Sequence, residues 1–469
     1  MWRLFHFLVY LAFRGCLLLI QLVPVELVFL VGMGGGEIAY WLLWKRRQLS
    51  LRNLTRALKG QKTRDELRAL NRLHFRRLAA NLLCCFKIDT MSPEEILKRV
   101  TVEKPQALEV PPEGQRTGWV AMISHLSNWE LFGSLTALFP DYQFGAVYQK
   151  LANPFIDQYL REMRAQAGIM LFERKEGFLR CIDFLRDGGA IGVLVDQSAG
   201  YAGLWTPLFG RLASCSTLAA SLAIRTEVPI VPIAIYTSSV ARWTVVGAEP
   251  IQPGADDMEP LTARINRQLE QQILRSPADW LWAHNRWKPL RPHFLFARDQ
   301  RRTLLPPDCD RQSLEPFRLL LESPATPVQA EASLPAIRAI KEGRPDLRLT
   351  ILVTSPLAEF WSSVPEVDEV MRSGDSKSPS LARIRALRDF DAAMVFTPSL
   401  SRALELWLAG VPIRVGPRGV SGSWCYNQFL PPPESEEEDP VLTFLRIAQS
   451  VGANINAALA AHSPHRTRI

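Results

Sequence analysis

The sequence predicts an α/β protein with a membrane-anchored domain built on a largely parallel sheet, followed by a C-terminal Rossmann-like α/β module. Three observations carry this prediction: an apolar N-terminus, an alternation of short apolar runs with helical stretches over residues 119 to 290, and a similar alternation after residue 315. The chain has 469 residues, which is too long for one ordinary domain. Its 47% hydrophobic and 22% charged residues are typical of a globular protein.

Residues 1 to 43 are predicted to form a hydrophobic membrane anchor. The apolar stretch is interrupted by Arg14, Gln21, Pro24 and Glu26. Basic residues follow it, and it has no convincing A-x-A cleavage site, which favours a retained anchor over a cleaved signal peptide. Because a carboxylate is costly inside a bilayer, three arrangements stay open: a spanning helix, an interfacial or re-entrant helix, and a hydrophobic helix of a soluble domain.

The formal net charge of +8 indicates an anionic partner. Cationic residues concentrate in residues 44 to 77, directly after the apolar N-terminus. This position favours a membrane surface over nucleic acid, because juxtamembrane cations attract anionic headgroups at roughly 1 kcal/mol each. The same basic flank places the following domain on the cytoplasmic side of the membrane.

The seven cysteines show neither a C-x-x-C pair nor a His/Cys cluster at zinc spacing. We therefore expect reduced thiols in a cytoplasmic compartment and no metal or other cofactor.

Periodicity divides the rest of the chain into two α/β segments. Residues 44 to 290 contain a helix near residues 65 to 86 and then the apolar runs "WVAMIS", "QFGAVY", "AIGVLVD" and "VPIVPIAIY", separated by helical stretches. Residues 291 to 315 are rich in proline and charge and are predicted to be a linker. Residues 316 to 469 contain the predicted strands "FRLLLE", "LRLTILVT", "DAAMVFT" and "VPIRVG", a solvated "PPPESEEEDP" loop, and one last helix near residues 440 to 460.

The stretch "WVAMISHLSNWELFG" places His125 at the end of a buried strand, five residues before Glu130. One interpretation is a helix start, because Ser127 to Glu130 fits the S-x-x-E capping box. The other is a general base with a carboxylate that fixes its tautomer, aimed at a hydroxyl. An H-x4-E spacing alone is weak support for the second interpretation.

Further motifs make the second interpretation stronger. The segments "HLSNWE", "VYQKLANPFIDQYLREMRAQAG", "LFERKEG", "IGVLVDQ", "TPLFGRLASCSTLAASLA", "VPIVPIAI" and "WLWAHNRWK" follow one another in this chain. Over residues 5 to 290 it resembles the bacterial lipid A biosynthesis acyltransferases. The resemblance implies an inner-membrane enzyme that transfers an acyl chain, from acyl carrier protein or a coenzyme A thioester, to a hydroxyl of an anionic phosphorylated glycolipid on the cytoplasmic face.

The resemblance also suggests site residues. His125 becomes the general base and Glu130 its partner. Four residues are assigned to substrate binding: Arg174, Asp196, Arg161 and Arg164. Each has a structural alternative, namely a surface arginine for Arg174, a helix cap for Asp196, and solvated charges for Arg161 and Arg164.

Other polar residues in these motifs are expected to serve the fold. We expect Ser127 and Asn128 to be turn or cap residues, and His284 and Arg286 to close the domain by packing rather than to contact glycolipid. One departure from the family is visible, because Tyr148-Gln149 stands where relatives often have "YR". This departure predicts the loss of a phosphate contact, and two acceptors stay open: a lipid A precursor and a different glycolipid.

The second segment resembles the N-terminal half of the lipopolysaccharide heptosyltransferases through "LPAIRAIKEGRPDLRLTILV", "PEVDEVM" and "LAGVPIRVG". In that family a Gly-Asp pair before the first of these motifs is thought to supply the base. Val328 and Gln329 stand there in this chain, and glutamine cannot accept the proton. The resemblance therefore implies a degenerate glycosyltransferase half. Two alternatives stay open: a bifunctional acyltransferase and glycosyltransferase, and a scaffold without catalysis.

Overall fold

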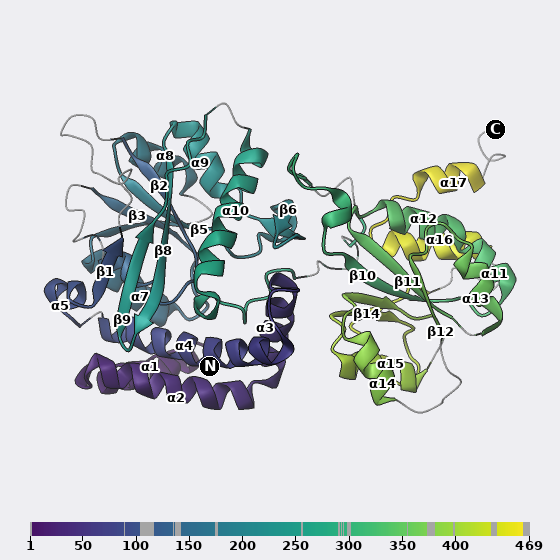
Figure 1. Cartoon of the computed structure of the whole chain (residues 1–469), viewed down its shortest axis with the longest axis horizontal. Helices are drawn as coiled ribbons and strands as arrows, with labels where there is room; N and C mark the ends of the chain where they lie inside the picture. Colours follow the sequence, from purple (N-terminus) through teal and green to yellow (C-terminus); the bar gives the residue numbers. More distant parts are fainter. Residues whose placement is uncertain are drawn as a thin grey trace. The chain divides into compact units, whose positions relative to one another are not determined.

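The computed structural model describes residues 2–88, 90–103, 117–134, 136, 142–173, 177–254, 257–288, 291, 293, 295–297, 302–353, 355–372, 380–396, 399–432 and 439–462. The chain divides into two compact units (Figure 1). Residues 1–199, 206–209 and 213–286 form the first unit, and residues 200–205, 210–212 and 287–469 form the second.

Four helices open the first unit: α1 (Trp2–Leu22), α2 (Val25–Leu42), α3 (Trp44–Ala57) and α4 (Arg64–Ile88). Pro24 separates α1 from α2, because proline is tolerated at a helix start but not in a helix interior. Both α1 and α2 are long and apolar enough to cross a membrane, with mean hydropathies of 1.7 and 1.3. Both also pack along α4, so they lie on the surface of their unit (Figure 1).

Two glycines allow α2 to approach α4 closely. A Cβ on Gly32 would lie 2.5 Å from the Cα of Ala80, and one on Gly36 would lie 2.3 Å from the carbonyl oxygen of Phe75. Glycines four residues apart lie on one face of a helix, so backbones can come together there. The apolar anchor predicted for residues 1 to 43 is thus fixed to the domain by backbone contact.

A seven-stranded sheet forms the centre of the first unit, in the order β1-β9-β8-β2-β5-β3-β4. Its strands are β1 (Val100–Glu103), β2 (Trp119–Ile123), β3 (Phe144–Tyr148), β4 (Ile169–Glu173), β5 (Ala190–Leu194), β8 (Ile230–Ser239) and β9 (Arg242–Gly247). All neighbouring strands are parallel except β8 and β9. The predicted largely parallel sheet is confirmed.

Helices lie before, between and after these strands, as expected where parallel strands need crossovers. They are α5 (Pro93–Leu97), α6 (Leu131–Ser134), α7 (Pro154–Gln166), α8 (Phe178–Arg186), α9 (Leu218–Thr226) and α10 (Met258–Arg275), with the 3₁₀ turns η3 (Gly200–Ala202) and η4 (Pro277–Asp279). The strands β6 (Leu204–Leu208) and β7 (Arg211–Cys215) pair separately as a two-stranded ribbon.

The second unit contains a six-stranded parallel sheet in the order β12-β11-β10-β13-β14-β15. Its strands are β10 (Phe317–Glu322), β11 (Leu347–Val353), β12 (Glu369–Arg372), β13 (Ala392–Met394), β14 (Ile413–Gly416) and β15 (Gln428–Phe429). Numbered from β10, this order is 3-2-1-4-5-6, the order of Rossmann folds. The Rossmann-like module predicted for this part of the chain is confirmed.

Helices cover both faces of this second sheet. They are α11 (Pro327–Ala332), α12 (Leu334–Glu342), α13 (Ala358–Ser362), α14 (Leu381–Leu387), α15 (Leu400–Ala409), α16 (Pro440–Ser450) and α17 (Asn456–His462), with the 3₁₀ turns η6 (Arg311–Ser313), η7 (Ser355–Leu357) and η8 (Ser423–Cys425). Side chains of β10 alternate between the two cores: Leu319 and Leu321 face the core on the α12 side, whereas Leu320 faces the core on the α15 side.

The single terminal helix predicted near residues 440 to 460 is two helices, α16 and α17. Gly452 adopts a φ of +92° just after α16, a conformation that favours glycine and ends helices. Most of the "PPPESEEEDP" segment, residues 433–438, lies outside the described residues.

The contact between α2 and α4 predicts a test of the N-terminal packing. Replacing Gly36→Leu should push the two backbones apart and destabilise the first unit by about 1 to 3 kcal/mol, as is usual for overpacking. Gly34→Leu is the matched control, because nothing lies within 4 Å of a Cβ at Gly34. Thermal unfolding in detergent measures both variants, and equal stability of the two would contradict the close approach.

Candidate active site

The pairing of β2 with β5 brings two sequence-predicted residues together at the carboxyl edge of the first sheet. Ile123 and Leu194, the last residues of the two strands, are register partners, and the amide of Val195 donates to the carbonyl of Ile123 at 3.1 Å. His125 and Asp196 each lie two residues beyond their strand. Equal offsets on parallel neighbours place the two side chains side by side at the edge where ligands of open α/β sheets bind.

Asp196 holds His125 through two hydrogen bonds. The Nδ1 of His125 lies 2.8 Å from Oδ1 of Asp196, and the backbone amide of His125 donates to Oδ2 at 2.8 Å. Trp280 donates its indole N–H to the same Oδ2, also at 2.8 Å. The carbonyl of His125 in turn accepts from the amide of Leu281 at 3.1 Å. Backbone and ring of the histidine are therefore both fixed.

Burial and hydrogen bonds together shift the pKa values of Asp196 and His125. Burial alone would raise the pKa of Asp196, but the His125 imidazole and the Trp280 indole lower the pKa to about 2, so the carboxylate is ionised. Burial also disfavours the imidazolium, yet Asp196 and, more weakly, Glu130 raise the pKa of His125 above 6.5. An ionised Asp196 accepts the Nδ1 proton, which leaves Nε2 as the basic nitrogen of the neutral ring.

Two side chains surround the catalytic end of this imidazole. The amide nitrogen of Gln197 lies 3.3 Å from Nε2 of His125. The ring of Trp129 meets the imidazole edge-on, with centroids 5.0 Å apart. In the neutral form of the ring, Nε2 can accept from the Gln197 amide, and a substrate hydroxyl that replaced this donor would give up its proton to Nε2.

Glu130 pairs with Arg164 of α7 rather than with the imidazole. The guanidinium of Arg164 donates to both carboxylate oxygens, at 2.7 Å and 3.3 Å. The direct hydrogen bond to His125 that the H-x4-E spacing suggested is made by Asp196 instead, because the β2–β5 register brings that carboxylate closer to Nδ1. Arg164, predicted to bind substrate, bonds to Glu130, and Glu130 lies close enough to His125 to raise its pKa.

The capping box predicted over Ser127 to Glu130 is wrong. The hydroxyl of Ser127 hydrogen-bonds that of Thr237 at 2.8 Å, and α6 begins only at Leu131. Ser127 has a φ of +51°, a sparsely populated conformation for a serine. Its amide is held by the carbonyl of Asp279 at 2.9 Å. The residue therefore makes a tight turn after His125, which agrees with the turn role expected of it.

Two more of the predicted residues, Arg161 and Arg286, can be placed in the structure. The guanidinium of Arg161 stacks over the ring of Tyr148, 5.7 Å from its centroid. Arg174 lies outside the described residues. Arg286 is buried and donates to the carbonyl of Ser214 at 2.8 Å, which agrees with the packing role expected of it.

His284 lies next to the segment that follows Asp196. Its Nε2 accepts from the amide of Ser198 at 3.5 Å, and burial lowers its pKa. A neutral His284 is compatible with the packing role expected of it and with a position close to the active centre.

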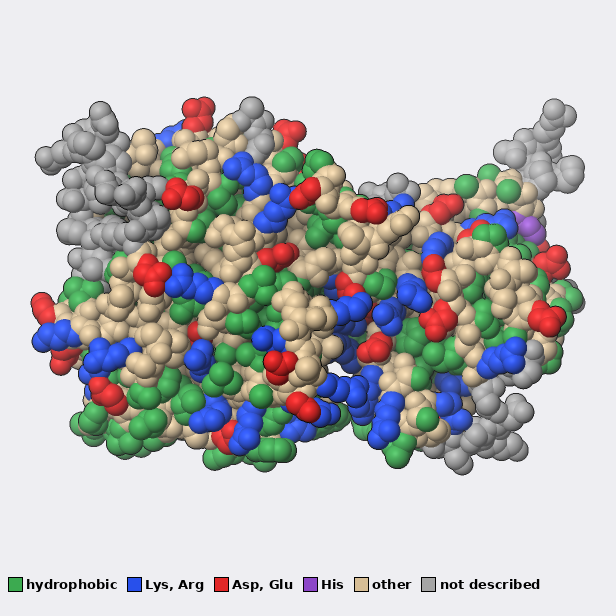
Figure 2. Space-filling model, in the orientation of Figure 1, with side chains coloured by type: hydrophobic (Ala, Val, Ile, Leu, Met, Phe, Trp, Pro, Cys, Tyr) green, Lys and Arg blue, Asp and Glu red, His purple; other side chains and the backbone are tan. Residues whose placement is uncertain are grey.

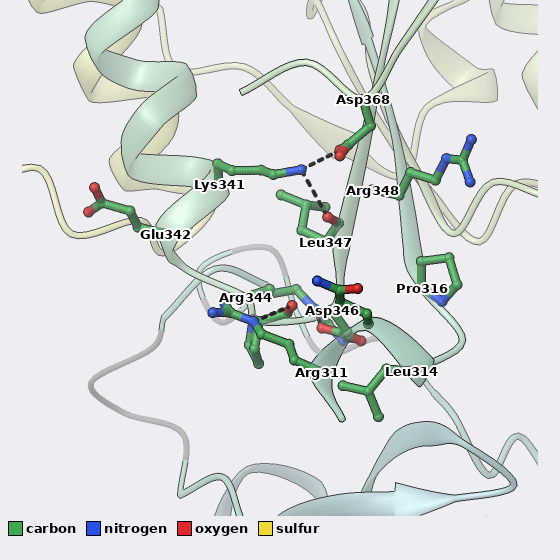
Figure 3. Close-up of a pocket in the computed structure, with 12 residues that line it drawn as sticks. Arg311, Leu314, Pro316, Lys341, Glu342, Arg344, Asp346, Leu347, Arg348 and Asp368 are labelled. Atoms are coloured by element: carbon green, nitrogen blue, oxygen red, sulfur yellow. Dashed lines mark hydrogen bonds and ion pairs between the residues drawn. The ribbon is translucent and has the colours of Figure 1, made fainter. Parts of the chain in front are cut away.

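The second unit has a cavity of about 780 Å³ at the amino ends of β10 and β11 (Figure 3). Its cations are largely neutralised by carboxylates: Lys341 pairs with Asp368, and Arg344 makes two 2.8 Å bonds to Asp346. Gln329, predicted to replace a glycosyltransferase base, lies in α11, where its amide is capped by the hydroxyl of Thr326. We assign no chemistry to this cavity.

Comparison with known proteins decides the family. The family model described as bacterial lipid A biosynthesis acyltransferase matches residues 3–289. The chain belongs to this family, and it is an acyltransferase. It is also similar to the lipid A biosynthesis lauroyltransferase of Escherichia coli K12, with 22% identity over 285 residues that cover 58% of this chain and 89% of the relative. These matches agree with the resemblance predicted for residues 5 to 290.

A solved structure of ADP-heptose lipopolysaccharide heptosyltransferase II from E. coli matches part of the chain with 21% identity and a TM-score of 0.25. The match covers 28% of this chain and 40% of that structure. This partial likeness carries no argument about the activity of the acyltransferase or of its second unit.

Sequence reasoning missed two residues that contact the His125–Asp196 pair, Gln197 and Trp280. Gln197 stands directly after Asp196 in "VDQ", so the motif that supplied one residue could have supplied both. Trp280 belongs to "WLWAHNRWK", where its bond to Asp196 depends on the antiparallel bridge between Leu126 and Trp280. No local sequence pattern predicts the bridge between Leu126 and Trp280.

The contact between His125 and Asp196 predicts that the pKa of His125 changes when Asp196 is replaced. Asp196→Asn removes the main charge that raises the pKa of His125 and leaves burial opposed only by the weaker effect of Glu130, so the pKa of His125 should fall below its value in the parent protein. NMR of histidine-labelled protein measures this, with His125→Gln to assign the signal. An unchanged pKa would show that Asp196 does not hold the imidazolium.

The shifted pKa values of His125 and Asp196 also make the free energy of unfolding depend on pH. The raised pKa of His125 contributes stability that is complete below 6.5 and is lost as pH rises through the folded-state pKa. The lowered pKa of Asp196 contributes stability that is present above 3.8 and is lost as pH falls toward about 2. Asp196→Asn should remove both contributions from a pH series of thermal unfolding.

Proposed function

We propose that this protein transfers a fatty acyl chain from an acyl thioester, with acyl carrier protein as the preferred donor, to a hydroxyl of a lipid A precursor at the cytoplasmic face of the inner membrane. The observation that carries the proposal is the His125–Asp196 pair: a buried imidazole whose Nδ1 is held by an aspartate carboxylate, which leaves Nε2 to act as the base, in a chain of the lipid A acyltransferase family. Its similarity to a lipid A biosynthesis lauroyltransferase supports both the acyl group and the acceptor class.

In the proposed mechanism His125 acts as base and then as acid. Its Nε2 takes the proton of the acceptor hydroxyl as the oxygen attacks the thioester carbonyl, which forms a tetrahedral oxyanion. Asp196 stabilises the imidazolium that results. When the carbon–sulfur bond breaks, the thiolate leaves and takes that proton from His125. An ester on the acceptor and a free thiol are the products, and the base returns to its neutral form.

We assign Glu130 an electrostatic and positioning role in this scheme. It raises the pKa of His125 without a hydrogen bond to the ring, and it fixes the guanidinium of Arg164. A fixed arginine near the base is suited to a phosphate of the acceptor, because its planar fork matches a phosphate group. Arg174 and Arg161 remain candidates for the same anionic substrate.

The N-terminal helices supply the proposed membrane contact. Apolar side chains gather on the surface over α1 and α2 (Figure 2), including Phe5, Leu19, Leu22 and Trp41, each more than 60% exposed. The charged interruptions have partners within the protein: Glu26 pairs with Arg99, and the exposed Arg14 lies 5.0 Å from the ring of Tyr159. Of the three arrangements left open by the sequence, we favour embedding along the interface, because the two helices pack against α4.

Removing the base should abolish acyl transfer without unfolding the protein. His125→Ala is expected to lower the rate by about 100- to 10,000-fold, the usual contribution of a general acid or base. The measurement is transfer of labelled acyl chains to a lipid A precursor in purified membranes, with mass spectrometry of the product. Full activity in a folded His125→Ala protein would overturn the proposal.

Glu130 and Arg164 should act as a unit. If the ion pair is what matters, Glu130→Gln and Arg164→Gln will each lower the rate, and the double variant will be hardly slower than the worse single variant. Glu162→Gln is the control, because Glu162 is an exposed carboxylate of the same helix that bonds Gln158. Independent, additive losses would show that the two residues serve separate functions.

Gln197 provides a separate test of the base. Its amide should stabilise the neutral imidazole of His125 by donating to Nε2, and we expect it to become a donor to substrate oxygen when the acceptor displaces it. Gln197→Ala should lower kcat, whereas Gln197→Glu should raise the histidine pKa and move the alkaline rise of the rate to higher pH. A pH–rate profile that is identical in all three proteins would contradict this placement.

A further inference from the structure

Helix α15 of the second unit is apolar on two sides. One side, with Ala403, Leu406 and Ala409, is buried against the sheet. The other presents Leu400, Trp407 and Leu408 to solvent at 44%, 42% and 46% exposure. These positions are seven and eight residues apart, so they lie on one helical stripe. A surface helix of a globular domain normally has a polar outer side, which α15 lacks.

The 3₁₀ turn η8 extends this apolar stripe. Trp424 is 64% exposed, and its ring meets that of Trp407 edge-on, with centroids 5.8 Å apart. Gly422 keeps η8 against the start of α15, because a Cβ there would lie 3.0 Å from a methyl of Leu400. We call Leu400, Trp407, Leu408 and Trp424 the tryptophan face.

Among the residues that the structure describes, the exposed charges on the segments next to α15 and η8 are mostly positive. On helix α14, which packs against α15, Leu381 and Arg385 are exposed, and the exposed Arg388 directly follows the helix. Arg418, also exposed, lies 5.0 Å from the ring of the exposed Phe429. Asp389, which follows Arg388, is exposed and acidic.

The acidic residue of α15 itself is turned inward. Glu405 is 1% exposed and is bonded by Arg383 at 2.6 Å and by Arg402 at 3.1 Å. The helix therefore presents no carboxylate with its exposed tryptophan and leucines. An apolar stripe of this kind, flanked by arginines, is complementary to a surface that is apolar below and anionic above.

We propose that the tryptophan face docks the second unit onto an anionic lipid surface. Two exposed tryptophans favour the water–lipid interface, where the ring is in apolar surroundings and the N–H reaches polar groups. Arginines beside an apolar helical stripe are typical of helices that lie in that interface. This contact is separate from α1 and α2, and it gives the second unit a role in membrane attachment that needs no glycosyltransferase chemistry.

A probe placed beside the face tests the proposal in the full-length protein. Cys16 and Cys309, the cysteines that are not buried, are first replaced by serine. A fluorophore is then attached at Ser421→Cys, next to η8, or at Ser363→Cys, an exposed position after α13 on the opposite side of the second sheet (Figure 1). Vesicles of phosphatidylethanolamine and phosphatidylglycerol carry a nitroxide quencher on their acyl chains.

Quenching at position 421 should exceed quenching at position 363 several-fold. Trp424→Ser should reduce the quenching at position 421. Replacing both tryptophans, Trp407→Ser with Trp424→Ser, should reduce it to the level at position 363. Charge reversal by Arg385→Glu with Arg388→Glu should reduce the quenching at position 421 as added salt does in the parent protein. Thermal unfolding checks that each variant is folded, and Trp424→Ser serves alone if the double replacement is unstable.

Three outcomes would overturn the proposal. These are equal quenching at the two positions, quenching at 421 that survives Trp424→Ser and charge reversal, and a fluorescence change at 421 that depends on protein concentration without vesicles. The last outcome would assign the face to a second copy of the chain. Acyl transfer is not the readout, so these outcomes leave the proposed function untouched.

Discussion

The active centre depends on the parallel pairing of β2 with β5. This pairing makes Ile123 and Leu194 partners, so that the residues two positions beyond them meet at one edge of the sheet. His125 and Asp196 are far apart in the sequence, and no local structure brings them together. A slip of one residue in this register would turn every side chain of the strand to the other face and separate the pair.

Because the site is buried, its hydrogen bonds determine which of its residues can carry a charge. In a site removed from water, an unpaired carboxylate or imidazolium would be costly. Asp196 remains charged because it accepts from His125 and from Trp280, and the tryptophan is brought there by the segment that crosses after α10. The same segment holds the backbone of His125, so the loop that closes the domain also fixes the tautomer of the base.

The two units use similar strands for different purposes. In the first, polar residues at the carboxyl edge form a connected site. In the second, the order of Rossmann folds is intact, yet Gln329 lies in α11 where the family resemblance would require a base. The unusual feature of the second unit is instead the apolar outer side of α15, which supports the membrane attachment proposed for this unit.

The sequence by itself determined the α/β class, both strand-and-helix segments, the acyltransferase family and His125 as the candidate base, because apolar periodicity and ordered motifs are local properties of the chain. It did not determine which carboxylate bonds His125, since spacing favoured Glu130 and only strand order brings Asp196 to Nδ1. It also could not separate the inner from the outer apolar stripe of α15, because both have the same period. Tertiary structure decided these points, because they depend on which elements become neighbours.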